Sequence, residues 1–282
     1  MAEPSNQDDP QLSPDASRIA VSRHDPETLA FDVWLLDLSR RTTSRVTFGP
    51  TNVYAPIWSP DGSQLVFTSN NRGAPDLYRR AITGAGTDDL ILHSDSRKTA
   101  TDWSRDGQFL VYTNHDPKTK ADIWILPLTG DHRPVAYLTS EFNEGSGRLS
   151  PDGQWIAYVS DETGRDEVYV QRFPRGGGKI QISPQGGARP QWRRRGHELF
   201  YVSADAKLMA VDVKLGATFE AGVPHPLFQV HLRDWTNRID YVSSRDNYAV
   251  NADGQRILVN AATDQKPMSI TVILHWAAGL KK

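Results

Sequence analysis

Four side chains with oxygen donors are spaced along the chain so that they could bind one hard cation. They are Asp8, Glu144, Asp246 and Asn247. Carboxylate and amide oxygens are the ligands that calcium selects, and a bound calcium ion can act as a Lewis acid on a carbonyl or phosphoryl oxygen. His231 and Asp234 are the candidates for a catalytic base beside such an ion. This set would suit a metal-dependent hydrolase, with calcium or another divalent cation as its candidate cofactor, and we treat it as one of two alternatives.

A second group of side chains is suited to binding. Aromatic rings can stack on a ligand, and an arginine guanidinium can hold a carboxylate or phosphate through two parallel hydrogen bonds. Most members of the group lie in residues 229–247, an insertion long enough to predict a functional loop. The alternative is a loop that folds over the edge of the protein with Trp235 as its anchor. The candidate binding residues are Tyr54, Arg189, Arg233, Trp235, Arg238 and Tyr241.

A repeated segment positions these residues. Trp58-Ser59-Pro60-Asp61-Gly62 precedes an apolar run, and related segments recur with their Gly position at residues 16, 62, 107, 153, 196 and 254, which are 46, 45, 46, 43 and 58 residues apart. Each copy reads as four short strands, because Pro-Asp-Gly predicts a tight turn between two apolar runs and no long window has a helical period. The six copies therefore account for nearly the whole chain.

The repeat predicts an all-β fold, namely a six-bladed β-propeller of four-stranded antiparallel blades. Residues 1–282 would form a single propeller domain, and residues 2–7 could complete the last blade. Tryptophans on the innermost strands, such as Trp58, Trp103 and Trp192, would pack between neighbouring blades. The predicted repeats are approximately 8–50, 51–95, 96–140, 141–185, 186–230 and 245–276, with 229–247 as the inserted loop.

The position of the site follows from the same architecture. An Asp recurs in the turn of the repeat, but there it should cap its own backbone, so we do not expect a ring of catalytic carboxylates. Six loops converge where the innermost strands begin, and this mouth of the central channel is where the candidate binding and metal residues should meet. The turn aspartates are Asp15, Asp61, Asp106, Asp152 and Asp253.

The segment 58–62, followed by its apolar strand and Asp76-Leu77-Tyr78, resembles the repeat of TolB-like propellers, which are related to WD40 repeats. Residues 219–228 and 270–281 resemble, more narrowly, the C-terminal propeller of bacterial Ser/Thr protein kinases of the eukaryotic type. That resemblance implies a sensor or interaction half, and no Gly-rich loop, His-Arg-Asp or Asp-Phe-Gly kinase motif occurs in the sequence. We expect a fragment or a short homologue of such a protein.

Composition removes several classes of function. Thirty-two Lys and Arg against 34 Asp and Glu give a net charge of −2, which does not favour nucleic acid as a partner. The absence of cysteine excludes disulfides and cysteine metal sites. The sequence has no long apolar stretch and no signal-peptide pattern, so we expect no membrane span in this chain. We also expect a monomer. It would be cytoplasmic as expressed, or extracytoplasmic if its parent is a membrane-anchored kinase.

Two classes of function are left open. The first is a non-catalytic module that recognises a protein, a peptide or a small ligand on its loop face. The second is a metal-dependent hydrolase of lactones, esters or phosphotriesters, native or promiscuous, with its site at the channel mouth. The sequence does not decide whether the protein is an enzyme, since it contains no Gly-x-Ser-x-Gly or other compact catalytic motif.

Overall fold

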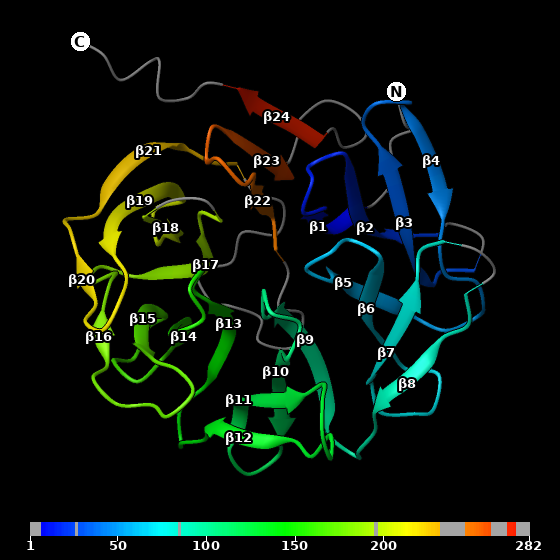
Figure 1. Cartoon of the computed structure of the whole chain (residues 1–282), viewed down its shortest axis with the longest axis horizontal. Coiled ribbons are helices and arrows are strands. Elements are labelled where there is room, and N and C mark those ends of the chain that lie inside the picture. The colour runs from blue at the N-terminus through cyan, green and yellow to red at the C-terminus, as the bar shows by residue number, and fades with distance from the viewer. Residues whose placement is uncertain are drawn as a thin grey trace.

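The computed structural model describes residues 7–25, 28–83, 86–194, 197–231, 246–260 and 270–274. These residues form strands and turns, which confirms the predicted all-β class. The sheets are arranged around a central axis, and the first and last sheets of the chain lie side by side (Figure 1). Within each sheet the strands pair in chain order from the axis outward. The described residues contain no helix with the length and apolar character that a membrane span needs.

The two strands nearest the axis are the most buried part of each sheet. The innermost strands are β1 (Gln7–Leu12), β5 (Val53–Trp58), β9 (Arg97–Trp103), β13 (Glu144–Leu149), β17 (Gly187–Trp192) and β22 (Tyr248–Val250). Their hairpin partners are β2 (Arg18–His24), β6 (Gln64–Ser69), β10 (Phe109–Asp116), β14 (Trp155–Ser160), β18 (Glu198–Ser203) and β23 (Arg256–Asn260). Central apolar residues of these hairpin partners, such as Leu65 and Ile156, have no exposed surface.

The outer strands differ from one sheet to the next. The third strands are β3 (Phe31–Asp37), β7 (Asp76–Ala81), β11 (Lys120–Pro127), β15 (Glu167–Arg172), β19 (Lys207–Lys214) and β24 (Ile270–Leu274). The outermost strands are β4 (Thr42–Arg45), β8 (Asp89–Leu92), β12 (Val135–Leu138), β16 (Ile180–Gln181), β20 (Glu220–Ala221) and β21 (His225–Gln229). Both β20 and β21 pair with β19, so that sheet has five strands.

The prediction of six four-stranded blades is wrong. The structure has five blades of four or five strands, and the β22–β23–β24 sheet that lies beside the first blade has three strands among the described residues. The repeat count equated every copy of the turn motif with a full blade, but the last copy provides only three strand segments in the described part of the chain. Residues 2–7, which were expected to complete this sheet, lie outside the described residues except for Gln7, and Gln7 pairs with β2.

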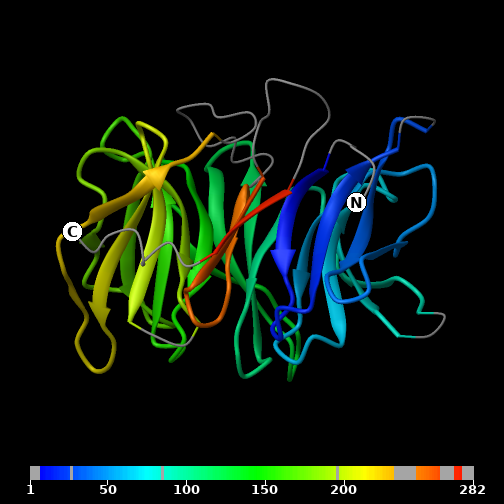
Figure 2. The ribbon, with the colours of Figure 1, turned by 90° about the horizontal axis from the view of Figure 1, so that it is seen from above.

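The strands run between two faces of the ring (Figure 2). We call the face where the innermost strands begin the start face, which is at the top in Figure 2, and the face where they end the turn face. The predicted turns lie on the turn face and are capped as expected. Asp61, for example, accepts hydrogen bonds from the Ser59 hydroxyl at 2.6 Å and from the Ser63 backbone amide at 3.0 Å. Gly62 adopts a φ of 71° there, a conformation that glycine tolerates without strain.

The innermost tryptophans pack between blades, which confirms their predicted role. Trp58 is 3% exposed and belongs to a cluster that joins β2 and β3 of the first blade to β5, β6 and β7 of the second. Trp192 has the same place between the fourth and fifth blades. Large rings at these positions fill the wedge between sheets that diverge from the axis, so the inner ends of the blades are fixed relative to one another.

Candidate functional site

A β-bulge recurs in the innermost strands just before their ends. Pairing skips two residues in β1, β5, β13 and β17, and one of the skipped residues has a left-handed φ between 53° and 57° in each strand. A bulge locally redirects the side chains that follow it. The residue directly before the repeated Trp or Leu position borders the axis in every sheet. These axial residues are Gln11, Ile57, Asp102, Arg148, Gln191 and Ala249.

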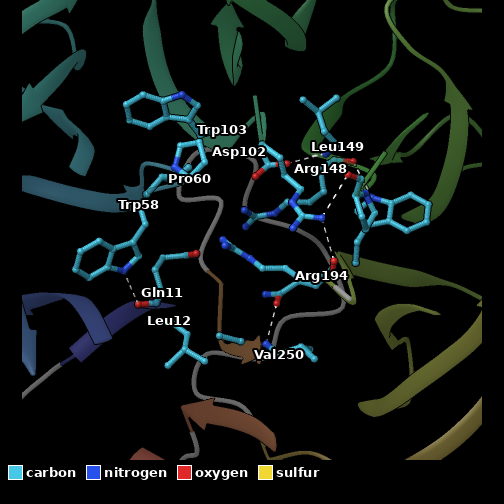
Figure 3. Close-up of a pocket in the computed structure, with 16 residues that line it drawn as sticks. Gln11, Leu12, Trp58, Pro60, Asp102, Trp103, Arg148, Leu149, Arg194 and Val250 are labelled. Carbon is cyan, nitrogen blue, oxygen red and sulfur yellow. Dashed lines mark hydrogen bonds between the residues drawn. The ribbon is translucent and has the colours of Figure 1, made fainter. Parts of the chain in front are cut away.

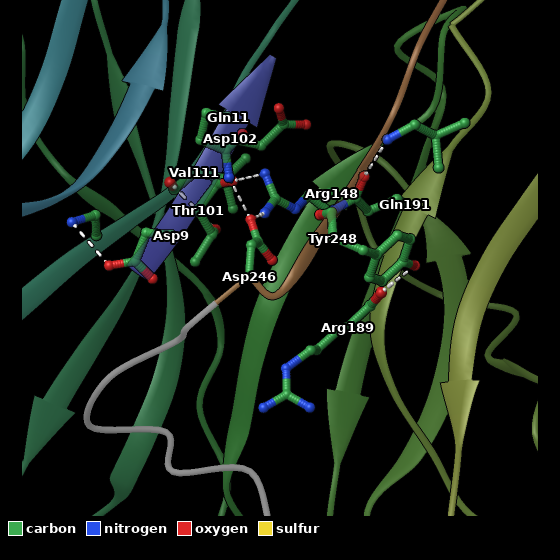
Figure 4. A network of polar contacts seen from close by, with 12 residues as sticks. Asp9, Gln11, Thr101, Asp102, Val111, Arg148, Arg189, Gln191, Asp246 and Tyr248 are labelled. Carbon is green, nitrogen blue, oxygen red and sulfur yellow. Dashed lines mark hydrogen bonds and ion pairs between the residues drawn. The ribbon is translucent and has the colours of Figure 1, made fainter. Parts of the chain in front are cut away.

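Arg148 connects three other sheets across the axis. Its guanidinium forms an ion pair with Asp246, two residues before β22, and donates a hydrogen bond to the Thr101 carbonyl of β9. Gln11 of β1 donates from Nε2 to the same Asp246 carboxylate at 2.5 Å. Figure 4 shows this axial network of Gln11, Thr101, Arg148 and Asp246. Because it spans the channel, it separates a pocket on the start face from one on the turn face.

The axial network bears on the predicted metal site. Burial opposes the charge of Arg148, but Asp246 and Asp102 hold the pKa of its guanidinium above the usual value. A carboxylate already neutralised by an arginine is a poor ligand for a cation. No group of three or more His, Asp or Glu side chains able to hold a metal ion occurs in the described part of the chain. The structure thus gives no support to a cation held jointly by Asp8, Glu144 and Asp246, and the metal is still only a prediction.

The larger cavity lies on the start face between the first two blades and has a volume of about 310 Å³. It brings together Tyr54 and Asp8, two residues that the sequence assigned to different sets. The Arg97 guanidinium lies over the Tyr54 ring at 5.5 Å, and burial raises the pKa of the Tyr54 hydroxyl. The complete lining is Asp8, Asp9, Ser22, Phe31, Asn52, Tyr54, Asn70, Pro75 and Arg97.

Hydrogen bonds hold the walls of this cavity in place. The Asp9 carboxylate accepts from the Ser22 hydroxyl at 3.0 Å and from the Ala55 amide at 3.3 Å, which connects the first two blades. Asn70 accepts at Oδ1 from the amide of Asn52 at 2.9 Å. Polar groups fixed by their own partners change position little when a ligand binds, so this cavity is preformed.

Glu144 begins β13 and is separate from the Tyr54 cavity. The residue is 5% exposed; Oε1 accepts a hydrogen bond from the Ser140 hydroxyl, whereas Oε2 has no partner among the described residues. Burial raises the pKa of Glu144 to about 7, and the nearby Asp122 adds to this effect. Glu144 is therefore a buried acid that can hold a proton near neutral pH.

The other predicted residues that the structure describes are not part of the cavity lining. Arg189 is buried in β17, burial lowers its pKa, and its backbone carbonyl accepts a hydrogen bond from the Tyr248 hydroxyl at 2.7 Å (Figure 4). Asn247 is buried next to Asp246, and His231 is exposed. The remaining candidates lie outside the described residues and stay predictions. They are Arg233, Asp234, Trp235, Arg238 and Tyr241.

A second pocket, of about 100 Å³, lies on the axis at the turn face. In Figure 3, Trp58, Pro60 and Trp103 lie on one side of it, and Arg148 and Arg194 lie on the other. Asp102 is also part of the lining. Its carboxylate accepts a hydrogen bond from the Leu149 amide at 2.7 Å, and burial raises the pKa of this carboxyl group. The sequence analysis did not predict this pocket. The polar or charged residues that directly precede several of the repeated Trp or Leu positions could have indicated it.

The comparisons with known proteins agree with this architecture. The profile of the TolB beta propeller domain matches residues 3–145, just over half of the 282 residues. The Tol-Pal system protein TolB of Francisella tularensis subsp. tularensis (strain WY96-3418) is 27% identical over 155 residues, which are 55% of this chain and 35% of that protein. The match thus covers well under two thirds of the relative's length.

Solved structures share the fold. TolB from Acinetobacter baumannii superposes with a TM-score of 0.68 at 18% identity and covers 92% of this chain and 61% of that one. An oligogalacturonate lyase in complex with manganese superposes with a TM-score of 0.61 at 13% identity, over 98% of this chain and 75% of the other. At such identities the likeness establishes the fold and leaves function to the site.

Proposed function

Because the chain belongs to the TolB beta propeller family, we propose that it is a non-catalytic binding module that takes part of a protein or peptide partner into its start-face cavity. The observation that carries the proposal is the cavity of about 310 Å³ beside Tyr54. This volume is at the lower end of the roughly 300–1,000 Å³ that ligand pockets occupy. It fits a side chain or a small ligand.

The wall chemistry supports binding. Phe31, Tyr54 and Pro75 offer apolar surface, Asn52 and Asn70 offer amide groups, and charges of both signs are present. Apolar walls with a few fixed polar groups are typical of recognition sites, where the polar groups set orientation. The relative from Francisella is named as a Tol-Pal system protein, and this name supports our proposal that the partner of this chain is a protein.

The test combines selection and mutation. Peptides are selected from a displayed library on the full chain, and their affinities are measured by calorimetry for the wild type, Tyr54→Ala and Arg97→Ala. We expect each variant to weaken binding at least tenfold, because aromatic and arginine anchors dominate such interfaces. Phe48→Ala is the matched control, since Phe48 is 69% exposed and lies outside the cavity. It should change affinity less than twofold.

Two results would contradict the proposal. Selected peptides that bind all variants equally would place recognition elsewhere. A hydrolysis screen of lactones, esters and phosphotriesters with turnover that disappears in EDTA would instead favour the metal-dependent hydrolase. The sensor role implied by the resemblance to kinase-attached propellers is consistent with a binding module and is still a prediction.

A further inference from the structure

The turn-face pocket contains three arginines in a small volume. Arg105 and Arg194 occupy the position of the repeat that is proline in three other copies, at Pro14, Pro60 and Pro151. Their side chains line the pocket together with the axial residue Arg148. The departures from the motif therefore place positive charge at one point on the axis.

Contacts across the pocket hold these arginines in place. Arg105 donates from Nη1 to the Arg194 carbonyl at 3.1 Å. The backbone of Arg148 is held by Trp192, whose indole N–H donates a hydrogen bond to the Arg148 carbonyl at 2.9 Å. The Arg194 guanidinium donates no hydrogen bond and forms no ion pair within the described ranges, whereas the Arg148 guanidinium already contacts Asp246 and the Thr101 carbonyl. Donors left without partners at a concave surface are suited to an oxyanion.

The charge of the site fits a monoanion. Three arginines face two aspartates, Asp102 and Asp246, which leaves one net positive charge. Burial lowers the pKa of Arg194, and so does its proximity to Arg105 and Arg148, whereas Asp102 raises it. An incoming negative charge would relieve the repulsion among the guanidinium groups. A single carboxylate balances the excess charge, whereas a phosphate dianion exceeds it.

We infer that the turn-face pocket binds a carboxylate group, with its oxygens at the guanidinium groups of Arg194 and Arg105, close to the charge of Arg148, and its carbon substituent against Trp58 and Trp103. A volume of about 100 Å³ accommodates a carboxylate and a few further atoms, such as the end of a peptide chain or a small organic acid. The site is distinct from the start-face cavity, because the two linings have no residue in common.

The test uses the full chain and three probes: N-acetylalanine, its neutral amide and inorganic phosphate. Binding is followed by the indole N–H signals of the eight tryptophans in NMR spectra, assigned with Trp→Phe variants. N-acetylalanine should shift the signals of Trp58, Trp103 and Trp192, and the amide should bind at least tenfold more weakly. Arg194→Ala should raise the dissociation constant of N-acetylalanine about tenfold, since hydrogen bonds between charged groups are strong.

Arg175→Ala is the matched control, because Arg175 is exposed and lies outside the pocket lining. It should change the dissociation constant less than twofold. Arg105→Ala is the second pocket variant, because Arg105 is exposed and its loss should not disturb folding. Equal binding of acid and amide, equal weakening by Arg175→Ala, or tighter binding of phosphate than of N-acetylalanine would each overturn the inference.

Discussion

The two mouths of the channel are built in different ways. The turn-face pocket is lined by equivalent residues from every sheet, such as Asp102, Arg148 and Gln191, each directly before the repeated Trp or Leu. The start-face cavity lies between two blades and is lined by residues that have no common position in the repeat, such as Asn70 and Arg97. The repeat therefore fixes which positions border the axis, although the residues at these positions differ, and it does not fix the loops around them.

The buried acids on either side of the axial network also differ. Burial raises the pKa of both Glu144 and Asp102, but Asp102 is close to Arg148 whereas the charged neighbours of Glu144 are Asp122 and Asp161. The nearby arginine counteracts the cost of burying Asp102. The two faces should therefore respond differently to pH, and three measurements can sharpen or break this comparison.

The largest loss of stability should come from replacing Arg148 in the axial network. Arg148→Ala would leave the Asp246 carboxylate, 6% exposed, buried without its ion pair. Removing one member of such a pair costs roughly 3–5 kcal/mol. Urea unfolding should show a loss of this size. A double variant, Arg148→Met with Asp246→Leu, should regain much of the stability, and a loss below about 1 kcal/mol for Arg148→Ala would show that the network does not hold the sheets.

The second effect is a pH dependence that arises at Glu144. Its folded pKa of about 7 exceeds the value of 4.5 expected without the fold, so between these pH values the folded protein holds a proton that the unfolded chain releases. The free energy of unfolding should therefore fall as pH rises from 4.5 to 7, by roughly 2–3 kcal/mol from this group. Unfolding at pH 5 and pH 8 should show a smaller difference for Glu144→Gln than for the wild type. Identical differences would contradict the assignment.

The smallest effect should come from the rim of the turn face. Asp61→Ala removes the acceptor for Ser59 and Ser63 in an exposed turn, where burial is slight and hydrogen bonds hold the pKa of Asp61 at about 2. The cost should be about 1 kcal/mol or less, as for other capping residues. Thermal unfolding measures it. A loss above about 2 kcal/mol would mean that these carboxylates do more than close their turns.

The sequence was most informative where a structural cause acts locally. Hydrogen bonds within a few residues fix the turn carboxylates such as Asp61, and the wedge between blades requires a large side chain such as Trp58, so both roles could be predicted. Counting turn motifs gave the wrong number of blades, because each motif specifies only the two inner strands of a blade and not the strands outside them. The fifth strand of the β17–β21 sheet was missed for the same reason.

The candidate site was harder to predict because its contacts join distant segments. Arg148 and Asp246 are 98 positions apart, and no local pattern indicates that they meet. Tyr54 and Asp8 were both selected, yet their shared cavity depends on Arg97 and Asp9, which belong to no motif. Arg105 and Arg194 could be recognised in the sequence as departures from the proline of the repeat. That they line the same pocket is evident only from the arrangement of the sheets around the axis.

The bulge that precedes the end of the innermost strands has a consequence for how such proteins diverge. It places the axial residue, such as Arg148 or Gln11, next to the residue that packs between blades, yet directs it to a different environment. Substitutions at one position can then accumulate without disturbing the other. The six copies accordingly carry different axial side chains, from Ile57 to Arg148, while the next position is Trp, Leu or Val in each of them.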